Sequence, residues 1–121
     1  MLLTLDVGNS QIFCGVFDGD DLKTTFRRTS SIRASSDEFG TFFRATLREN
    51  GVDPEEIEMA GICSVVPDAL HSLRNCFRKY FHFEPFLLKP GVKTGLKIRY
   101  RNPLEVGADK IANAIGALTR F

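Results

Sequence analysis

Residues 2–29 read LLTLDVGNSQIFCGVFDGDDLKTTFRRT, and the three strands that this stretch predicts establish the type of sheet. The apolar run from Leu2 to Val7 predicts a short buried strand. The run from Gln11 to Phe17 predicts a second strand with apolar side chains on both faces: Ile12, Cys14 and Val16 on one, Phe13 and Phe17 on the other. We therefore expect this second strand to be central in a sheet that is covered on both sides.

A third strand is predicted from Leu22 to Thr29, where residue types alternate. Its two sides would carry Leu22, Thr24 and Phe26 on one and Lys23, Thr25 and Arg27 on the other, as in a half-buried strand. Turn residues separate the three strands, with Gly8-Asn9-Ser10 after the first and Asp18-Gly19-Asp20-Asp21 after the second. The stretch therefore predicts an antiparallel meander.

The apolar period then becomes helical. Ser35 and Glu38 fit a capping box, and a helix follows that ends near Asn50-Gly51. A second helix is expected from Pro67, and a third begins near Val106 to Ala108. The apolar stripes of the three helices are, in order, Phe39, Phe42, Phe43 and Leu47; Leu70, Leu73, Phe77, Tyr80 and Phe81; and Ile111, Ile115 and Leu118.

Strands alternate with these helices. Met59 to Val66 and Pro85 to Leu88 are predicted strands, and Leu96 to Arg101 is an alternating extended segment. A meander followed by βα crossovers predicts an α/β fold of the ribonuclease H-like kind, a mixed sheet covered by helices. The last helical stripe runs close to Phe121 without a capping residue, so the sequence does not close as we expect of a finished domain.

Composition excludes several classes of protein. The chain has 121 residues, of which 43% are hydrophobic and 26% charged, and its net charge is +1. A near-neutral chain argues against a nucleic-acid partner. No apolar run approaches the roughly 18 residues that a membrane span needs, and Asp6 interrupts the N-terminal apolar run. We expect a cytoplasmic protein without a membrane partner.

The cysteines and histidines do not predict a metal site. Cys14, Cys63 and Cys76 are widely spaced and odd in number, which favours free thiols in a reducing compartment. Cys63 lies in an apolar run and is expected to be a small core residue. His71 and His82 have no nearby ligand partner in the sequence and are expected on a helix surface or an edge.

A first candidate site lies at Asp6-Val7-Gly8-Asn9-Ser10, where a strand turns into the next strand. Gly8 permits close approach of backbone amides to an anion, and Asp6 is suited to hold a hydrated Mg²⁺ beside it. The stretch is not a P-loop, because it lacks the G-x-x-x-x-G-K-[ST] pattern. An ordinary hairpin turn, with Asp and Asn bonding to their own backbone, is the alternative.

A second candidate site lies at Val106-Gly107-Ala108-Asp109-Lys110, where a helix is expected to open. The unpaired amides of a first helical turn would stabilise Asp109 as a carboxylate. Such a carboxylate can orient an attacking hydroxyl group in phosphoryl transfer. The alternative is a favoured first-turn Asp followed by a solvated Lys110.

The two sites and two further blocks resemble the N-terminal half of the type III pantothenate kinases, within the superfamily of acetate and sugar kinases, actin and heat-shock chaperones. The resemblance covers essentially the whole chain and implies that residues 1–121 form an N-terminal ribonuclease H-like lobe with the start of an inter-lobe helix. The matching blocks are LDVGNS at Leu5–Ser10, ICSVVP at Ile62–Pro67, KTGLKIRY at Lys93–Tyr100 and NPLEVGADKIANA at Asn102–Ala114.

The resemblance implies a homodimeric cytoplasmic enzyme that phosphorylates pantothenate with ATP, the first step of coenzyme A biosynthesis. It implies a need for Mg²⁺ and for a monovalent cation, K⁺ or NH₄⁺, whose ligand is not in this chain. Asp109 would accept the proton of the pantothenate hydroxyl, and Asp6 would lie near the Mg²⁺. The ATP phosphates would be lined by Asp6, Val7, Gly8, Asn9, Ser10, Gln11, Ile12 and Phe13. Pantothenate would be bound by Tyr100, Gly107, Ala108, Asp109 and Lys110.

Two departures from the family pattern leave alternatives open. Lys110 stands where the family usually has Arg, and an ammonium group lacks the fork-shaped hydrogen bonding of a guanidinium. The family's second lobe, with another phosphate loop, is absent, so we expect the chain alone to be inactive or nearly so. A non-catalytic paralogue or regulatory fragment that binds pantothenate or nucleotide is the alternative. A ribonuclease H-like nuclease is disfavoured, because Asp6 is the sole acid within a predicted central strand.

Overall fold

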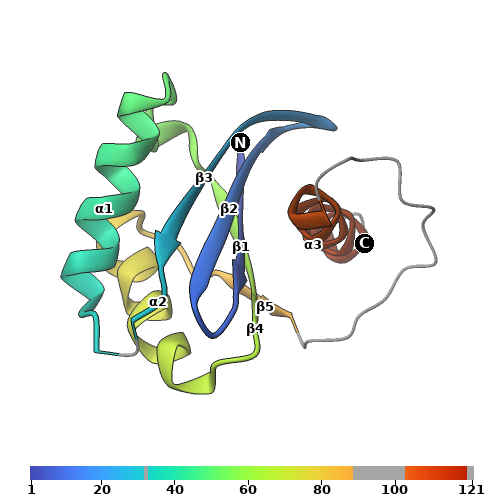
Figure 1. Ribbon diagram of the computed structural model, residues 1–121. Coiled ribbons are helices and arrows are strands. Elements are labelled where there is room, and N and C mark those ends of the chain that lie inside the picture. The colour runs from blue at the N-terminus through green and yellow to red at the C-terminus, as the bar shows by residue number, and fades with distance from the viewer. Residues whose placement is uncertain (32, 89–102, 120–121) are drawn as a thin grey trace.

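A five-stranded mixed sheet forms the centre of the protein, as seen in a computed structural model that describes residues 1–31, 33–88 and 103–119. Helices α1 (Ser36–Glu49) and α2 (Pro67–Tyr80) cover one face, and α3 (Pro103–Thr119) lies on the other (Figure 1). The strand order is β3-β2-β1-β4-β5. The strands are β1 (Leu2–Val7), β2 (Gln11–Asp18), β3 (Asp21–Thr29), β4 (Met59–Ser64) and β5 (Phe86–Leu88).

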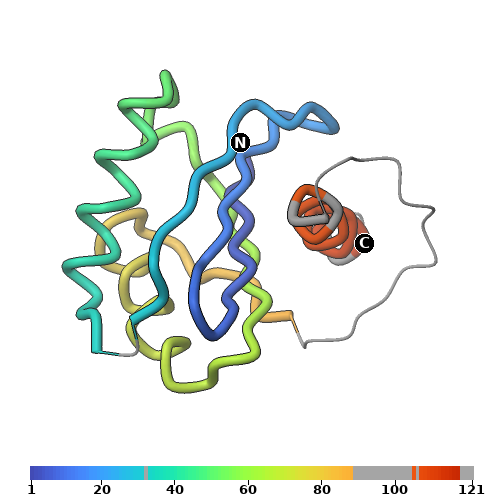
Figure 2. Tube along the Cα trace, in the orientation of Figure 1, coloured from blue at the N-terminus to red at the C-terminus, as the bar shows by residue number. Residues whose placement is uncertain are grey.

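The pairing of the strands confirms the predicted meander and crossovers. Strands β1, β2 and β3 pair in antiparallel fashion, whereas β4 pairs in parallel with both β1 and β5. The tube in Figure 2 follows the chain from the meander through α1 to β4 and α2. Strand β2 is central and buried on both faces, with Ile12, Cys14 and Val16 in the core under α1 and α2 and Phe13 and Phe17 in the core under α3.

The predicted alternation of the third strand is wrong at one end. Phe17 pairs with Leu22 and Val16 pairs with Thr24, so Lys23 is an extra residue that forms a β-bulge in β3. The bulge reverses the alternation, so Leu22 packs against the core under α3 while Phe26 packs against the core under α1 and α2. The strand begins at Asp21, one residue earlier than expected.

Aromatic side chains fill the core between the sheet and helices α1 and α2. Phe39, Phe43 and Phe77 are completely buried. The rings of Phe43 and Phe77 are stacked with centroids 5.9 Å apart, and the Arg28 guanidinium lies 5.0 Å from the Phe39 centroid. The predicted cap of α1 is confirmed, because the Ser35 hydroxyl accepts a hydrogen bond of 3.1 Å from the Glu38 amide.

Two strand boundaries differ from the prediction. Strand β4 ends at Ser64 rather than Val66, because the Ser64 hydroxyl accepts a 2.9 Å hydrogen bond from the Val66 amide and forms a local turn. Val65 is then 55% exposed. Strand β5 lacks Pro85, and β2 extends one residue further than predicted, to Asp18.

Helix α3 begins earlier than predicted, at Pro103 rather than near Val106 to Ala108. Proline favours the first helical position, where its missing N–H would have no partner. Ala108, Ile111 and Ile115 are buried against the sheet, which confirms two residues of the predicted stripe. The side chain of Leu118, and the predicted extended segment Leu96–Arg101 with Tyr100, lie outside the described residues.

The remaining expectations concern thiols, histidines and membranes. Cys14 and Cys76 are buried free thiols, whereas Cys63 is half-buried rather than fully in the core. His71 is exposed on α2, and His82 is exposed just after it. No helix in the described part of the chain is long and apolar enough to cross a membrane.

Candidate active site

The candidate site is centred on Asp6, which lies near the end of β1 on the face that α3 covers. In the sheet, Asp6 pairs with Phe13 of β2 and with Cys63 of β4. Directly paired residues share a face, so the Asp6 side chain lies between an aromatic ring and a thiol. Phe13 in turn pairs with Arg27, whose guanidinium lies 5.6 Å from the Phe13 ring centroid. The row across the sheet therefore holds a carboxylate beside an aromatic ring and a thiol, with a guanidinium beyond the ring.

This environment makes the charged form of Asp6 unfavourable. Burial raises the pKa of the Asp6 carboxyl above its ordinary value of 3.8. No donor of a hydrogen bond or ion pair to this carboxylate occurs among residues 1–31, 33–88 and 103–119. Burial also raises the pKa of the Cys63 thiol, and the neighbouring Asp6 charge adds to the effect. A cation bound at Asp6 would offset the free-energy cost of burying the charged carboxylate.

The turn after β1 is tied to its neighbours by backbone hydrogen bonds. The Gly8 amide donates to the Gln11 carbonyl over 2.9 Å, and the Gly8 carbonyl accepts from the Ser30 hydroxyl over 2.8 Å. The Ser30 amide also donates to the Ser10 carbonyl over 3.0 Å. Asn9 and Ser10 are exposed. The turn is therefore held in place by β3 while its two polar side chains remain accessible.

Helix α3 approaches this corner through Gly107. A Cβ atom placed on Gly107 would lie 2.9 Å from Oδ2 of Asp6. The next residue, Ala108, is buried and its Cβ would lie 3.2 Å from a Cβ placed on Gly15 of β2. The structure thus brings together two predicted sites that are about one hundred residues apart in the sequence.

Asp109 and Lys110 are half-buried residues of the same helix. The side-chain Nδ2 of Asn113 donates to Oδ2 of Asp109 over 3.4 Å. The argument from first-turn amides is wrong for Asp109, because α3 begins at Pro103 and Asp109 lies in its second turn, where the amides are paired within the helix. Tyr100, the remaining residue of the predicted substrate site, lies outside the described residues.

Sequence reasoning missed two residues in the row of Asp6: its neighbour Cys63, and Arg27, which lies one strand beyond Phe13. Cys63 and Arg27 share its row across the sheet, and only the register of β4 and β3 reveals this. The apolar run around Cys63 gave no sign that its thiol would face a carboxylate. The spacing of the described residues also provides no group of three or more His, Cys, Asp or Glu that could hold a metal ion by itself.

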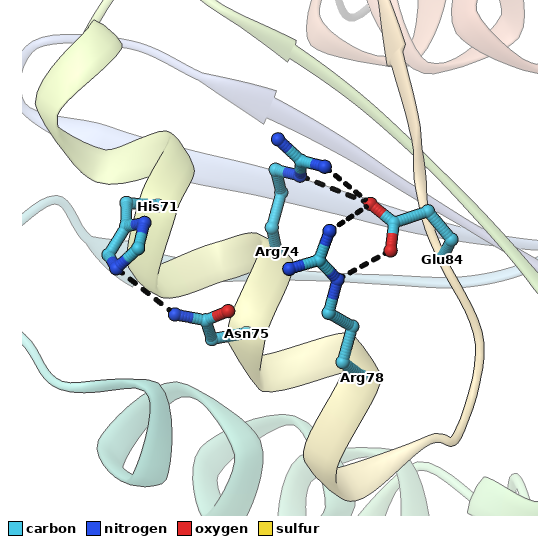
Figure 3. Close-up of polar contacts among 5 residues, drawn as sticks. All are labelled: His71, Arg74, Asn75, Arg78 and Glu84. Atoms are coloured by element: carbon cyan, nitrogen blue, oxygen red, sulfur yellow. Dashed lines mark hydrogen bonds and ion pairs between the residues drawn. The ribbon is translucent and has the colours of Figure 1, made fainter.

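A second polar cluster lies on α2, which covers the opposite face of the sheet from α3. In Figure 3, Arg74 and Arg78 both point to Glu84, and His71 contacts Asn75. The shortest Arg74–Glu84 and Arg78–Glu84 distances are 2.8 and 2.5 Å. These ion pairs lower the pKa of Glu84 to about 2. The two cations are therefore already paired, and the cluster ties α2 to the segment that leads into β5.

Comparisons with known proteins agree with the fold and identify the family. A sequence profile described as type III pantothenate kinase matches residues 2–121. The chain is 58% identical over 121 residues to a type III pantothenate kinase of Legionella pneumophila strain Corby, and 54% identical to one of Elusimicrobium minutum. Each alignment covers 100% of this chain and 47% of the relative, so the chain spans about half the length of these relatives.

The solved structures support the fold at a more distant level. A hexokinase of the ROK type from Thermus thermophilus matches with a TM-score of 0.56 and 19% identity, over 73% of this chain and 34% of the hexokinase. The likeness to a sugar kinase agrees with the ribonuclease H-like lobe expected from the order of strands and helices. By the sequence match across its whole length, the chain belongs to the type III pantothenate kinase family.

Proposed function

We propose that residues 1–121 form the N-terminal lobe of an enzyme that transfers the γ-phosphoryl group of ATP to the primary hydroxyl of pantothenate, the first step of coenzyme A biosynthesis. The observation that carries this proposal is the apposition of Asp6 and Gly107 in a chain of this family. The apposition unites a phosphate-binding type of turn with a helix that carries a carboxylate and a cation. A kinase needs these two halves of a site next to each other.

The turn is proposed to bind ATP. Asp6, Val7, Gly8, Asn9, Ser10, Gln11, Ile12 and Phe13 would line its phosphates. The polar side chains of Asn9 and Ser10 are exposed, whereas Val7, Ile12 and Phe13 are buried in the core, so these three would take part through their backbone only. Asp6 is half-buried and has no partner among the residues that the structure describes, so it suits a hydrated Mg²⁺, because carboxylate oxygen is a preferred ligand of this ion. Mg²⁺ would neutralise charge on the phosphates.

Helix α3 is proposed to bind pantothenate. Gly107, Ala108, Asp109 and Lys110, together with Tyr100, would form this part of the site. Asp109 would orient the attacking hydroxyl and accept its proton as the oxygen bonds to the γ-phosphorus and ADP leaves. The Lys110 ammonium would attract the pantothenate carboxylate as a point charge, without the bidentate geometry of an arginine.

The complete enzyme is proposed to be a cytoplasmic homodimer that also requires K⁺ or NH₄⁺. The relatives are about twice as long as this chain, so the ligand of the monovalent cation and a second lobe would come from sequence beyond these 121 residues. A nucleotide bound between two lobes would contact only one side of its cleft here. We therefore expect the isolated chain to have little or no activity.

The test measures ATP-dependent phosphorylation of radiolabelled pantothenate. The chain is assayed alone and mixed with the separately produced C-terminal half of the Legionella relative. We expect activity in the mixture, and a loss of about 100-fold or more with Asp109→Asn, the range that removal of a general base produces. Asp20→Asn is the matched control, because Asp20 is an exposed carboxylate in the β2–β3 turn.

Two outcomes contradict the proposal. An inactive mixture in which calorimetry detects binding of neither ATP nor pantothenate would sink the kinase assignment. Equal activity of Asp109→Asn and Asp20→Asn mixtures would remove Asp109 from the reaction. Turnover by the chain alone that Asp109→Asn abolishes would instead overturn the expectation that one lobe is insufficient.

A further inference from the structure

The contact between α3 and Asp6 depends on the absence of a side chain at position 107. A Cβ atom there would lie 2.9 Å from Asp6 Oδ2 and 3.9 Å from its Cγ. Cβ atoms do not approach oxygen this closely in proteins, so a side chain at 107 would force the carboxylate to move. Glycine is also a poor choice for a helix interior, because it loses more backbone entropy than alanine.

We infer that Gly107 is a positioning residue, whose missing side chain leaves the space in which the Asp6 carboxylate lies against α3. Its effect is to fix the place of that carboxylate relative to Asp109 and Lys110 on the same helix. The catalytic meaning of this inference rests on the proposed function, whereas its steric basis does not.

The surroundings of Asp6 leave the carboxylate little freedom to adapt. Phe13 and Cys63 flank it on the neighbouring strands and pack into the core under α3. A methyl group at position 107 would close the side that faces the helix. The carboxylate would then have to turn away from α3, and any ligand held by it would turn away as well.

The other glycine contacts of α3 have a different character. A Cβ on Gly61 of β4 would meet Ile111 and Ile115 at 3.0 and 2.9 Å, and one on Gly15 would meet Ala108 at 3.2 Å. These are apolar contacts that let the helix dock closely on the sheet. Among the glycines of the described residues, Gly107 is the one whose added Cβ would meet a charged group.

Gly116 provides a matched control on the same helix. A Cβ placed on Gly116 meets no atom within 4 Å, although this residue is also inside α3. Gly116→Ala therefore tests the gain in helix propensity without a steric contact. That gain corresponds to a rise in the melting temperature of about 4 °C for a chain of this size.

The first experiment measures melting temperatures of the 121-residue chain for Gly107→Ala and Gly116→Ala in three backgrounds: the natural sequence, Asp6→Asn and Asp6→Ala. We expect Gly116→Ala to raise the melting temperature equally in all three. Gly107→Ala should raise it less, or lower it, in the first two backgrounds, because Asn has the shape of Asp. With Asp6→Ala, Gly107→Ala should give the same rise as Gly116→Ala. An equal effect of Gly107→Ala in all three backgrounds overturns the inference.

The second experiment separates positioning from a general structural role. Calorimetry gives the affinity of the chain for ATP in MgCl₂ and in EDTA, and the ratio of the two reports the part that depends on Mg²⁺. We expect Gly107→Ala to reduce this ratio by about threefold or more and Gly116→Ala to leave it unchanged. An unchanged ratio in Gly107→Ala overturns the positioning role. If the natural chain alone binds no ATP in either solution, the ratio is measured in the mixture with the C-terminal half. Absence of ATP binding in that mixture as well would contradict the proposed function, and the melting temperatures alone would then decide the steric role of Gly107.

Discussion

Replacement of Gly40 by alanine should destabilise the protein strongly, although alanine is the better helix former. Gly40 lies on the buried side of α1, where α1 packs against α2. A Cβ atom there would lie 2.1, 2.4 and 2.7 Å from three ring atoms of Tyr80. All three distances are far below an ordinary carbon–carbon contact of roughly 3.5–4.0 Å.

The Tyr80 ring cannot easily move aside, because both ends of the residue are held. Its hydroxyl donates a 2.6 Å hydrogen bond to Oδ1 of Asp37, which also accepts from Lys79 over 2.7 Å. At the other end, the Tyr80 carbonyl accepts a 2.9 Å hydrogen bond from the Arg44 guanidinium. Movement of the ring would therefore break a hydrogen bond or separate the two helices.

The magnitude follows from three contributions. Overpacking of a well-filled contact costs about 3 kcal/mol at the upper end of its range, which suits a clash with three ring atoms. Loss of the Tyr80–Asp37 hydrogen bond costs about 1 kcal/mol more. Alanine recovers about 1 kcal/mol through helix propensity. The free energy of unfolding should therefore fall by about 3 kcal/mol, which lowers the melting temperature by roughly 10 °C.

Urea denaturation followed by circular dichroism measures this change, with Gly116→Ala as the control that gains helix propensity without a clash. A second measurement places Gly40→Ala in a Tyr80→Ala background, where the ring is absent. There the substitution should stabilise the protein by about 1 kcal/mol. Stability of Gly40→Ala equal to or above that of the natural chain, with Tyr80 present, would refute the packing argument.

Three further predictions concern single residues. Glu84→Gln should lower the melting temperature at pH 6, and the difference from the natural chain should vanish as the pH falls from 4.5 to about 2. The ion pairs hold the Glu84 pKa at about 2 in the folded state, and they stabilise the protein only while the carboxylate is charged. Thermal scans of both proteins across this pH range check the prediction. His82 has a φ of 64°, a left-handed conformation that glycine adopts without strain and β-branched residues avoid. His82→Gly should therefore raise the free energy of unfolding by about 0.5–1 kcal/mol, and His82→Val should lower it. Urea denaturation curves of both variants measure the sign of each change. Asp6→Asn should raise the melting temperature at pH 7, because burial in the folded state favours the neutral carboxyl group over the charged one. This gain should disappear as the pH falls through the raised pKa of Asp6 towards 3.8, where the carboxyl group becomes neutral. A gain that is the same at pH 3 and pH 7 would contradict this explanation.

Local patterns were sufficient to predict most of the fold. Strand β2 is apolar on both faces, and such a strand needs a neighbouring strand on each side and helices above and below the sheet. The pattern at Gln11–Phe17 was therefore sufficient to predict a sheet covered on both faces. The bulge at Lys23 was not predictable, because the alternation of residue types continues across it. Pairing with β2 decides the faces of β3, and pairing is a property of two segments together.

The start of α3 was misjudged for a different reason. The predicted start lay near Val106 to Ala108, although proline favours the first helical position and Pro103 stands just before this stretch. In the structure, Pro103 begins the helix, and Gly107 is explained by its contact with Asp6. The glycine within this helical pattern therefore marks the close approach of another segment, not the start of the helix.

The candidate site was predicted only in parts. Asp6 and the turn after it were identified from residue types, and so were Gly107 to Lys110. That these two segments meet could not be deduced from either one, since about one hundred residues separate them. The meeting point depends on α3 docking on β1, β2 and β4, which in turn depends on Gly15 and Gly61 leaving room for Ala108, Ile111 and Ile115.

The cost of Asp6 to folding is itself an argument about function. The neighbouring positions of β1 are fully buried, and the residues paired with Asp6 are Phe13 and Cys63, so an apolar side chain would suit this place better. Helix α3 adds a second locally unfavourable choice, since its interior carries glycine, which has a lower intrinsic helix propensity than alanine. Each choice lowers stability, and the two are in contact. Two departures from local preference that are in contact with each other support the proposal of a ligand site at Asp6, because nothing among the described residues explains a carboxylate that lacks a partner there.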